Sequence, residues 1–163
     1  MIVDPILLLA FIPVGLALNV TPGPDRMFCL AQGLRGGARC GWAGSAGVAL
    51  GGMVHVLLAG LGLGALVAAL PGAFDVIRWG GAAYLAWIAW KTLRTPIAGS
   101  DAPMMVPAKA AKQGFVVNIT NPKFILFVLA FVPQFVDPIL PVVPLFLIYG
   151  LLMSTGGLAV DGL

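Results

Sequence analysis

The chain has 163 residues, of which 60% are hydrophobic and 9% are charged, and its formal net charge is +3. Soluble domains carry roughly a quarter charged residues to cover a water-facing surface, so this composition excludes a soluble domain. It predicts an all-α integral membrane protein. Because no basic stripe with interleaved aromatic residues occurs, nucleic acid is excluded as a partner.

Uncharged runs predict about five transmembrane helices in a single transmembrane domain, residues 1–163. A helix needs about 20 predominantly apolar residues to cross the hydrocarbon of a bilayer. The predicted spans run from Pro5 through Pro24 into Leu34, within Cys40–Phe74, over Val76–Leu93, over Gly114–Phe135 and over Pro138–Val160.

Basic residues predict where the loops lie, because cytoplasmic loops hold an excess of Lys and Arg. They gather between the first and second spans and between the third and fourth. This pattern predicts an amino terminus outside the cytoplasm and a cytoplasmic loop at residues 94–113. The loop separates residues 5–93, a first repeat of three helices, from residues 114–163, an incomplete second repeat.

Glycines recur in the second predicted span at intervals of three or four residues, at Gly44, Gly47 and Gly51. Small residues at this spacing form a stripe on one helix face and let a neighbouring backbone approach closely. The stripe predicts a tightly packed helix pair, and the alternative is a smooth face on which one bundle slides during transport.

A polar phrase that breaks the helix occurs twice inside the apolar spans, at residues 19–25 (NVTPGPD) and 118–123 (NITNPK). Proline removes a backbone donor, and in hydrocarbon the broken backbone is tolerated only where it faces protein or a water-filled cavity. Paired breaks in two halves of a membrane protein are typical of secondary transporters with inverted repeats. We therefore predict that substrate binds at Asn19, Thr21, Pro22, Gly23, Pro24, Asp25, Asn118, Thr120, Asn121, Pro122 and Lys123.

Ionisable residues inside the spans are costly in hydrocarbon, so each is a functional candidate. Asp25 follows the first break and is expected to bind a cation or a proton, although it could instead cap its own helix or pair with Arg26. Lys123 holds the equivalent place after the second break, so the two charges could form a buried pair or bind the two ends of a zwitterion. The alternative for Lys123 is snorkelling to the interface. His55 is a second candidate for proton coupling, although packing is the commoner role of a lone histidine.

No enzyme motif accompanies these phrases. The sequence has no phosphate-binding loop, no Gly-x-Ser-x-Gly elbow and no His-Glu metal pair. Cys29 and Cys40 lack the spacing of metal or redox sites. We therefore expect no metal, no cofactor and no enzymatic activity.

Four separated motifs give the chain a family resemblance. They are residues 21–25 (TPGPD), the series Gly33, Gly37, Gly41 and Gly47, residues 80–85 (GGAAYL) with Trp90-Lys91, and residues 118–123 with 133–135 (PQF). The chain resembles the LysE/RhtB family of amino-acid exporters, and the resemblance extends over essentially its whole length. It implies a multi-pass protein of the bacterial inner membrane that exports amino acids or close derivatives, such as homoserine, threonine or lysine. Protons, the amino-acid substrate and the lipid bilayer are the partners that it implies.

The resemblance also adds a third candidate for proton coupling, because Asp161 matches a position where the family often carries an acidic residue. Family members usually have a sixth span, so the chain resembles an exporter truncated near its C-terminus and lacking the last helix. The uncovered face predicts that a partner chain covers it, as in a homo-oligomer, or that export is disabled. The alternative function is a non-transporting subunit that pairs with a full-length relative, and a membrane enzyme is the least favoured.

Overall fold

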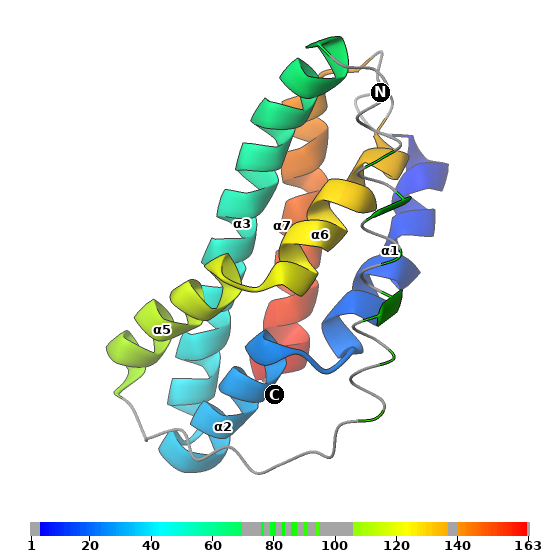
Figure 1. Ribbon diagram of the computed structural model, residues 1–163. Helices are drawn as coiled ribbons and strands as arrows, with labels where there is room; N and C mark the ends of the chain where they lie inside the picture. Colours follow the sequence, from blue (N-terminus) through cyan, green and yellow to red (C-terminus); the bar gives the residue numbers. More distant parts are fainter. Residues whose placement is uncertain are drawn as a thin grey trace.

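The computed structural model describes residues 4–69, 106–136 and 140–162, with single helical positions between 76 and 94. Every regular element in these ranges is helical, as the all-α prediction requires (Figure 1). The helices are α1 (Pro5–Val20), α2 (Pro24–Gly36), α3 (Ala38–Ala69), α5 (Pro107–Ile119), α6 (Pro122–Ala130), the 3-10 helix η1 (Val132–Phe135) and α7 (Val142–Gly162).

Two to four candidate membrane spans come from the described helices. α3 and α7 are each long and apolar enough to cross a bilayer alone. α1 and α2 form a bent pair with an angle of 59°, and α5 with the α6–η1 segment forms another with an angle of 55°. If each bent pair is one span, they are the first and fourth predicted spans, while α3 and α7 are the second and fifth. The third predicted span, Val76–Leu93, lies mostly outside the described residues.

Part of the segment predicted as a cytoplasmic loop is helical. α5 begins at Pro107, inside the segment 94–113 that the charge pattern assigns to a loop. Proline suits the first position of a helix because its missing N–H would be unpaired there in any case. Lys109 and Lys112 therefore lie on the first turns of α5, where both side chains are exposed.

Both bent pairs break in the same way. In each, a proline is the first residue of the second helix, Pro24 in α2 and Pro122 in α6, and a charged residue follows it. The equivalence of Asp25 and Lys123 that the sequence predicts is confirmed at this level. α2 then ends at Gly36, and the φ of 74° at its C-cap Gly37 is a conformation that glycine adopts readily.

Glycines let α3 lie directly against α5. A side chain at Gly47 would meet the carbonyl of Ala111, and one at Gly114 would meet the carbonyl of Gly44. A Cβ at Gly51 would lie 2.9 Å from Cβ of Asn118. The glycine stripe thus packs a helix pair, as predicted, and it brings Asn118 close to the axis of the bundle.

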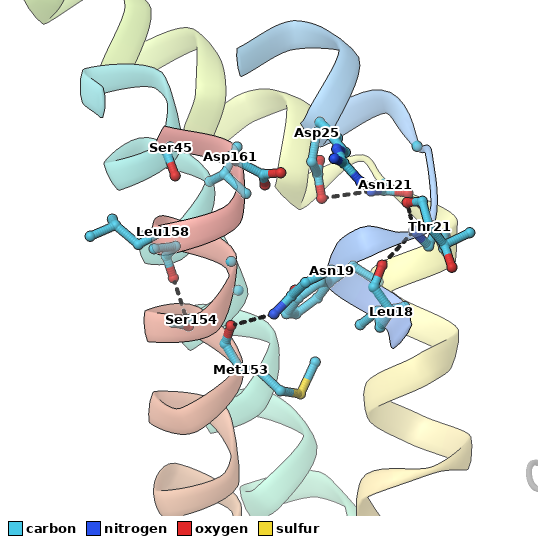
Figure 2. Close-up of a pocket in the computed structure, with 18 residues that line it drawn as sticks. Leu18, Asn19, Thr21, Asp25, Ser45, Asn121, Met153, Ser154, Leu158 and Asp161 are labelled. Atoms are coloured by element: carbon cyan, nitrogen blue, oxygen red, sulfur yellow. Dashed lines mark hydrogen bonds between the residues drawn. The ribbon is translucent and has the colours of Figure 1, made fainter. Parts of the chain in front are cut away.

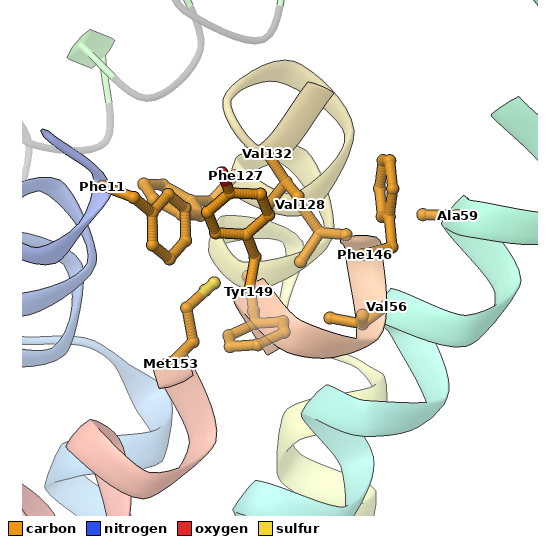
Figure 3. Packing of buried hydrophobic residues seen from close by; sticks show 10 residues of the cluster. Phe11, Val56, Ala59, Phe127, Val128, Val132, Phe146, Tyr149 and Met153 are labelled. Carbon is orange, nitrogen blue, oxygen red and sulfur yellow. The ribbon is translucent and has the colours of Figure 1, made fainter. Parts of the chain in front are cut away.

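An apolar core joins α1, α3, α6, η1 and α7 on one side of the breaks (Figure 3). Phe11 of α1 packs against Tyr149 of α7 with ring centroids 4.6 Å apart, and the Tyr149 hydroxyl donates to the carbonyl of Phe135 at 2.8 Å. α3 and α7 lie side by side through this region (Figure 1). The core holds α1 and α6, one helix of each bent pair, against α3 and α7.

Candidate functional site

The two breaks meet at a small polar cavity that α7 closes from one side (Figure 2). Its volume is about 40 Å³, and since a water needs about 10–15 Å³ on such a measure, it has room for only a few waters. The lining mixes charged and polar side chains inside an otherwise apolar chain. These are Asn19, Thr21, Asp25, Arg26, Ser45, Asn121, Lys123, Ser154 and Asp161.

Lys123 is held by the broken end of α1. Pro22 has no N–H, so it cannot donate to the carbonyl of Leu18 four residues earlier. The Lys123 ammonium donates to this carbonyl at 2.9 Å and to the carbonyl of Thr21 at 2.7 Å. The Lys123 side chain is only 8% exposed. The alternative that it snorkels to an interface is therefore wrong.

Arg26 plays the same part for the second proline of the break. Pro24 leaves the carbonyl of Val20 without its helical donor, and the Arg26 guanidinium donates to that carbonyl. Two cations therefore lie at the C-terminal end of α1, where the helix dipole favours positive charge. Both side chains also line the cavity.

Asp25 joins the two breaks. Its Oδ2 accepts from the side-chain amides of Asn118 at 2.9 Å and Asn121 at 2.8 Å. Gly23 is the N-cap of α2 and no side chain caps that helix, so the capping alternative for Asp25 is wrong. Its other oxygen, Oδ1, is buried and has no hydrogen-bond partner within the described part of the chain.

Asp25 and Lys123 do not bond to each other, although both belong to the described residues. Asp25 bonds to two amides and Lys123 to two carbonyls, so the predicted direct pair is wrong. They nevertheless line the same cavity and interact electrostatically. Binding of a zwitterion between them stays a prediction.

His55 supports the second break from outside the cavity. Pro122 leaves the carbonyl of Asn118 without its helical donor. The backbone N–H of Asn121 donates to this carbonyl at 2.9 Å, and Nε2 of His55 lies 3.3 Å from it. The His55 ring also packs 6.0 Å from the Phe124 ring. This placement suits a packing role, and a proton relay through His55 stays a prediction.

Asp161 approaches the cavity from α7. Figure 2 shows its side chain facing the same space as Asp25. Asp161 interacts electrostatically with Asp25, Arg26 and Lys123. Its buried Oδ1 has no hydrogen-bond partner among the residues that the structure describes, and the same holds for the hydroxyl of Ser45 on α3.

Asn19 closes the cavity against α7. Its side-chain amide donates to the carbonyl of Met153 at 3.1 Å. A Cβ at Gly156 would lie 2.9 Å from Nδ2 of Asn19, and one at Gly157 would lie 3.3 Å from its Oδ1. The two glycines thus allow the end of α1 to approach α7.

The predicted substrate-binding residues divide into three groups. Thr120 is exposed, and its hydroxyl donates to the carbonyls of Val116 and Val117 on its own helix, so its predicted place in the site is wrong. Asn118 lies behind Asp25, and the three prolines shape the breaks without lining the cavity. The predicted residues that line it are Asn19, Thr21, Gly23, Asp25, Asn121 and Lys123.

Sequence reasoning missed three polar residues of the lining: Arg26, Ser45 and Ser154. No sequence signal singled out Ser45, which shares its face of α3 with Val48, Ala49 and Gly52 rather than with the stripe of Gly44, Gly47 and Gly51. Arg26 directly follows Asp25, and the carbonyl of Val20 that it binds is four residues before Pro24. Counting four residues back from each proline would have indicated the carbonyls that need a side-chain donor.

Comparison with known proteins places these residues in a family context. The family model described as LysE type translocator matches residues 16–158, which include both breaks. No solved structure matches the chain significantly.

Individual relatives are similar over most of this chain. An uncharacterized membrane protein of Vibrio cholerae is 33% identical over 150 residues, which cover 90% of this chain and 73% of that protein. A homoserine/homoserine lactone efflux protein of Salmonella typhi is 32% identical over 144 residues, covering 86% and 70%. A leucine efflux protein of Klebsiella pneumoniae is 35% identical over 122 residues, covering 72% and 58%.

Proposed function

Because the chain belongs to the LysE type translocator family, we propose that it exports amino acids or close derivatives of the homoserine, threonine or lysine type by proton-coupled secondary transport. The observation that carries the proposal is the polar cavity at the two breaks, which has carboxylates and cations on one lining. The efflux proteins among the relatives support the same direction of transport.

The charges of the cavity suit the two ends of an amino acid. Oδ1 of Asp25 is an acceptor that the amides leave unused, so it can take the substrate ammonium. The Lys123 ammonium has three N–H donors, and two of them bond to the carbonyls of Leu18 and Thr21. The third donor, with the guanidinium of Arg26, can bind the substrate carboxylate.

The site must open to admit a substrate, since a cavity of about 40 Å³ is too small for an amino acid. The bends of 59° and 55° lie next to the cavity, at chain breaks that several side-chain hydrogen bonds hold. We infer that opening changes these bends, and that the two bent pairs are the moving elements of an inverted-repeat transporter.

The surface of the helices suits the bilayer of a multi-pass membrane protein, for which we propose the bacterial inner membrane. Large apolar side chains cover outer faces of α1 and α3, among them Ile6 (76% exposed) and Leu50 (64% exposed). Lipid would cover such side chains. A homo-oligomer stays a prediction.

The proposal is tested by extrusion of labelled homoserine, threonine, leucine and lysine from preloaded bacteria that express the chain. We expect export above the vector background, its loss when the proton gradient is collapsed, and a loss of about tenfold or more in Asp25→Asn. Asp4→Asn is the matched control, because Asp4 is exposed and caps α1 far from the cavity. Absence of export from wild-type chain that reaches the membrane would contradict the proposal and favour the non-transporting subunit.

A further inference from the structure

Three buried oxygen atoms at the cavity lack hydrogen-bond partners in the described part of the chain. They are Oδ1 of Asp25 on α2, Oδ1 of Asp161 on α7 and Oγ of Ser45 on α3, and all three residues line the cavity. Ser45 is only 1% exposed. A buried polar atom without a partner costs free energy, so such atoms usually mark a bound water, ion or proton.

No direct ion pair links the cations of the lining to the two carboxylates in the described part of the chain. Lys123 and Arg26 bond to carbonyls of α1, and neither bonds to Asp25 or Asp161 within the described residues. Two ionised carboxylates that face one small cavity repel each other strongly. One proton between them removes this repulsion and converts one acceptor into a donor.

We propose that the cavity binds one proton between Asp25 and Asp161, and that Asp161 is the residue that carries it. Two amide donors to Oδ2 favour the ionised form of Asp25. The Asp161 carboxylate, by contrast, accepts no hydrogen bond at either oxygen from the described residues, and its Oδ1 is buried. The remaining volume holds a few waters, which can link the two carboxylates.

Other charged or titratable groups reach this pair from three elements, α2, α3 and α6. Lys123 on α6 interacts electrostatically with both carboxylates and Arg26 on α2 interacts with Asp161, while the two carboxylates interact with each other. His55 on α3 interacts with Asp25 from outside the cavity, and Cys29 on α2 is buried beside both carboxylates. The lining residues from α1 are uncharged.

This inference deepens the proposed function, on which its transport consequence rests. The proton and the substrate ammonium would compete for the same carboxylates, so the cavity would hold one or the other. Exclusive occupancy couples proton entry to substrate exit. Access to the site changes from one side of the membrane to the other with a proton bound in one direction and with an amino acid bound in the other.

The first test needs no substrate. The full chain in lipid nanodiscs is titrated while infrared spectroscopy follows the C=O stretching band of a protonated carboxyl group. We expect a band at neutral pH that disappears as pH rises, is absent in Asp161→Asn, and persists in Asp161→Glu and Asp4→Asn. In Asp25→Asn its midpoint should move to lower pH by about one unit or more, since the repulsion is gone. All six acidic residues of the chain are aspartates, so the band is assigned by its loss in Asp161→Asn.

Three outcomes would overturn the proton site. They are a wild-type chain without the band at neutral pH, a band that survives in monodisperse Asp161→Asn protein, and loss of the band on adding Na⁺ at constant pH. The last result would identify a sodium site instead.

Transport of labelled homoserine by proteoliposomes shows whether Asp161 carries the proton or binds the substrate. Asp161→Asn should keep exchange of homoserine across the membrane but lose net transport driven by a pH gradient, whereas Asp25→Asn should lose both. Equal loss of exchange in both variants would make Asp161 a substrate ligand and refute its role as carrier. A wild-type chain that shows the infrared band but moves no homoserine would refute the proposed function and leave the proton site standing.

Discussion

Lys123 donates a hydrogen bond of 2.9 Å to the carbonyl of Leu18, the carbonyl that Pro22 leaves without a helical donor. Arg26 serves the carbonyl of Val20 in the same way, because Pro24 removes its donor. Each proline of the first break is thus matched by one cation. The prolines leave two carbonyls without helical donors, and the two cations satisfy these carbonyls. Substitutions of a proline and of its cation should therefore be tested together.

We predict that Lys123→Met destabilises the protein by about 2 kcal/mol or more, because it leaves two carbonyls without a donor. Pro22→Ala restores an N–H four residues after Leu18. The double variant should therefore lose less stability than the sum of the two single variants, which unfolding in detergent by a double-mutant cycle would measure. Lys112→Met, at an exposed position of α5, is the control. Additive losses would show that Lys123 does not replace the missing backbone donor.

Asn121 combines two roles that substitution can separate. Its Oδ1 caps α6 by accepting from the backbone N–H of Lys123 at 3.0 Å, and its Nδ2 donates to Asp25 at 2.8 Å. Asn121→Asp keeps the cap but places a carboxylate against Asp25. We predict that it lowers export by about tenfold or more while the midpoint of thermal unfolding falls less than in Asn121→Ala, which loses both roles.

The two measurements of the Asn121 variants have different meanings. A larger loss of export in Asn121→Ala than in Asn121→Asp would mean that the cap, rather than the amide donated to Asp25, limits transport. Equal export by all three proteins would contradict the place of Asn121 in the site.

The positions of the breaks were predictable because they follow from covalent chemistry. Proline removes the N–H that would continue a helix, and each phrase adds polar side chains that compete for backbone hydrogen bonds, whereas the lone Pro13 stays inside α1. The equivalence of Asp25 and Lys123 also followed, since both come directly after the proline that begins a helix. Their partners did not follow, because Asp25 reaches amides of α5 and α6 only through the packing of α2 against α5.

The remaining errors in the site have a similar cause. Thr120 belongs to the second phrase, yet its rotamer turns the hydroxyl back to the carbonyl of Val116, an option that Thr has at any helix end. Ser45 belongs to neither phrase and enters the lining because the α3 face that carries it turns toward the cavity. Membership of a polar phrase therefore predicted the region of the site better than its individual ligands.

Thr120 provides a test of this correction. Because its hydroxyl bonds to its own helix on the exposed side, Thr120→Val should leave export within about twofold of wild type. Asn19→Leu, which removes a lining amide and its bond to the carbonyl of Met153, should lower export much more. The same extrusion assay compares the two, and a severe loss in Thr120→Val would return that residue to the site.

Glycine substitutions should separate close packing from helix propensity within α3. Gly47→Ala would push a methyl group into the carbonyl of Ala111, whereas a Cβ at Gly62 meets nothing within 4 Å. We predict that Gly47→Ala costs about 1–3 kcal/mol by overpacking, and that Gly62→Ala is neutral or stabilising. Unfolding in detergent measures both.

The Gly47 substitution should also affect function, because displacing α5 moves Asn118, which donates to Asp25 at 2.9 Å. Export should therefore fall in Gly47→Ala even at a temperature where the protein stays folded, while Gly62→Ala keeps it. If Gly47→Ala is unstable but fully active when folded, the contact between α3 and α5 supports the fold without positioning the carboxylate. If both variants are unchanged, the close approach of the two helices at Gly47 is itself refuted.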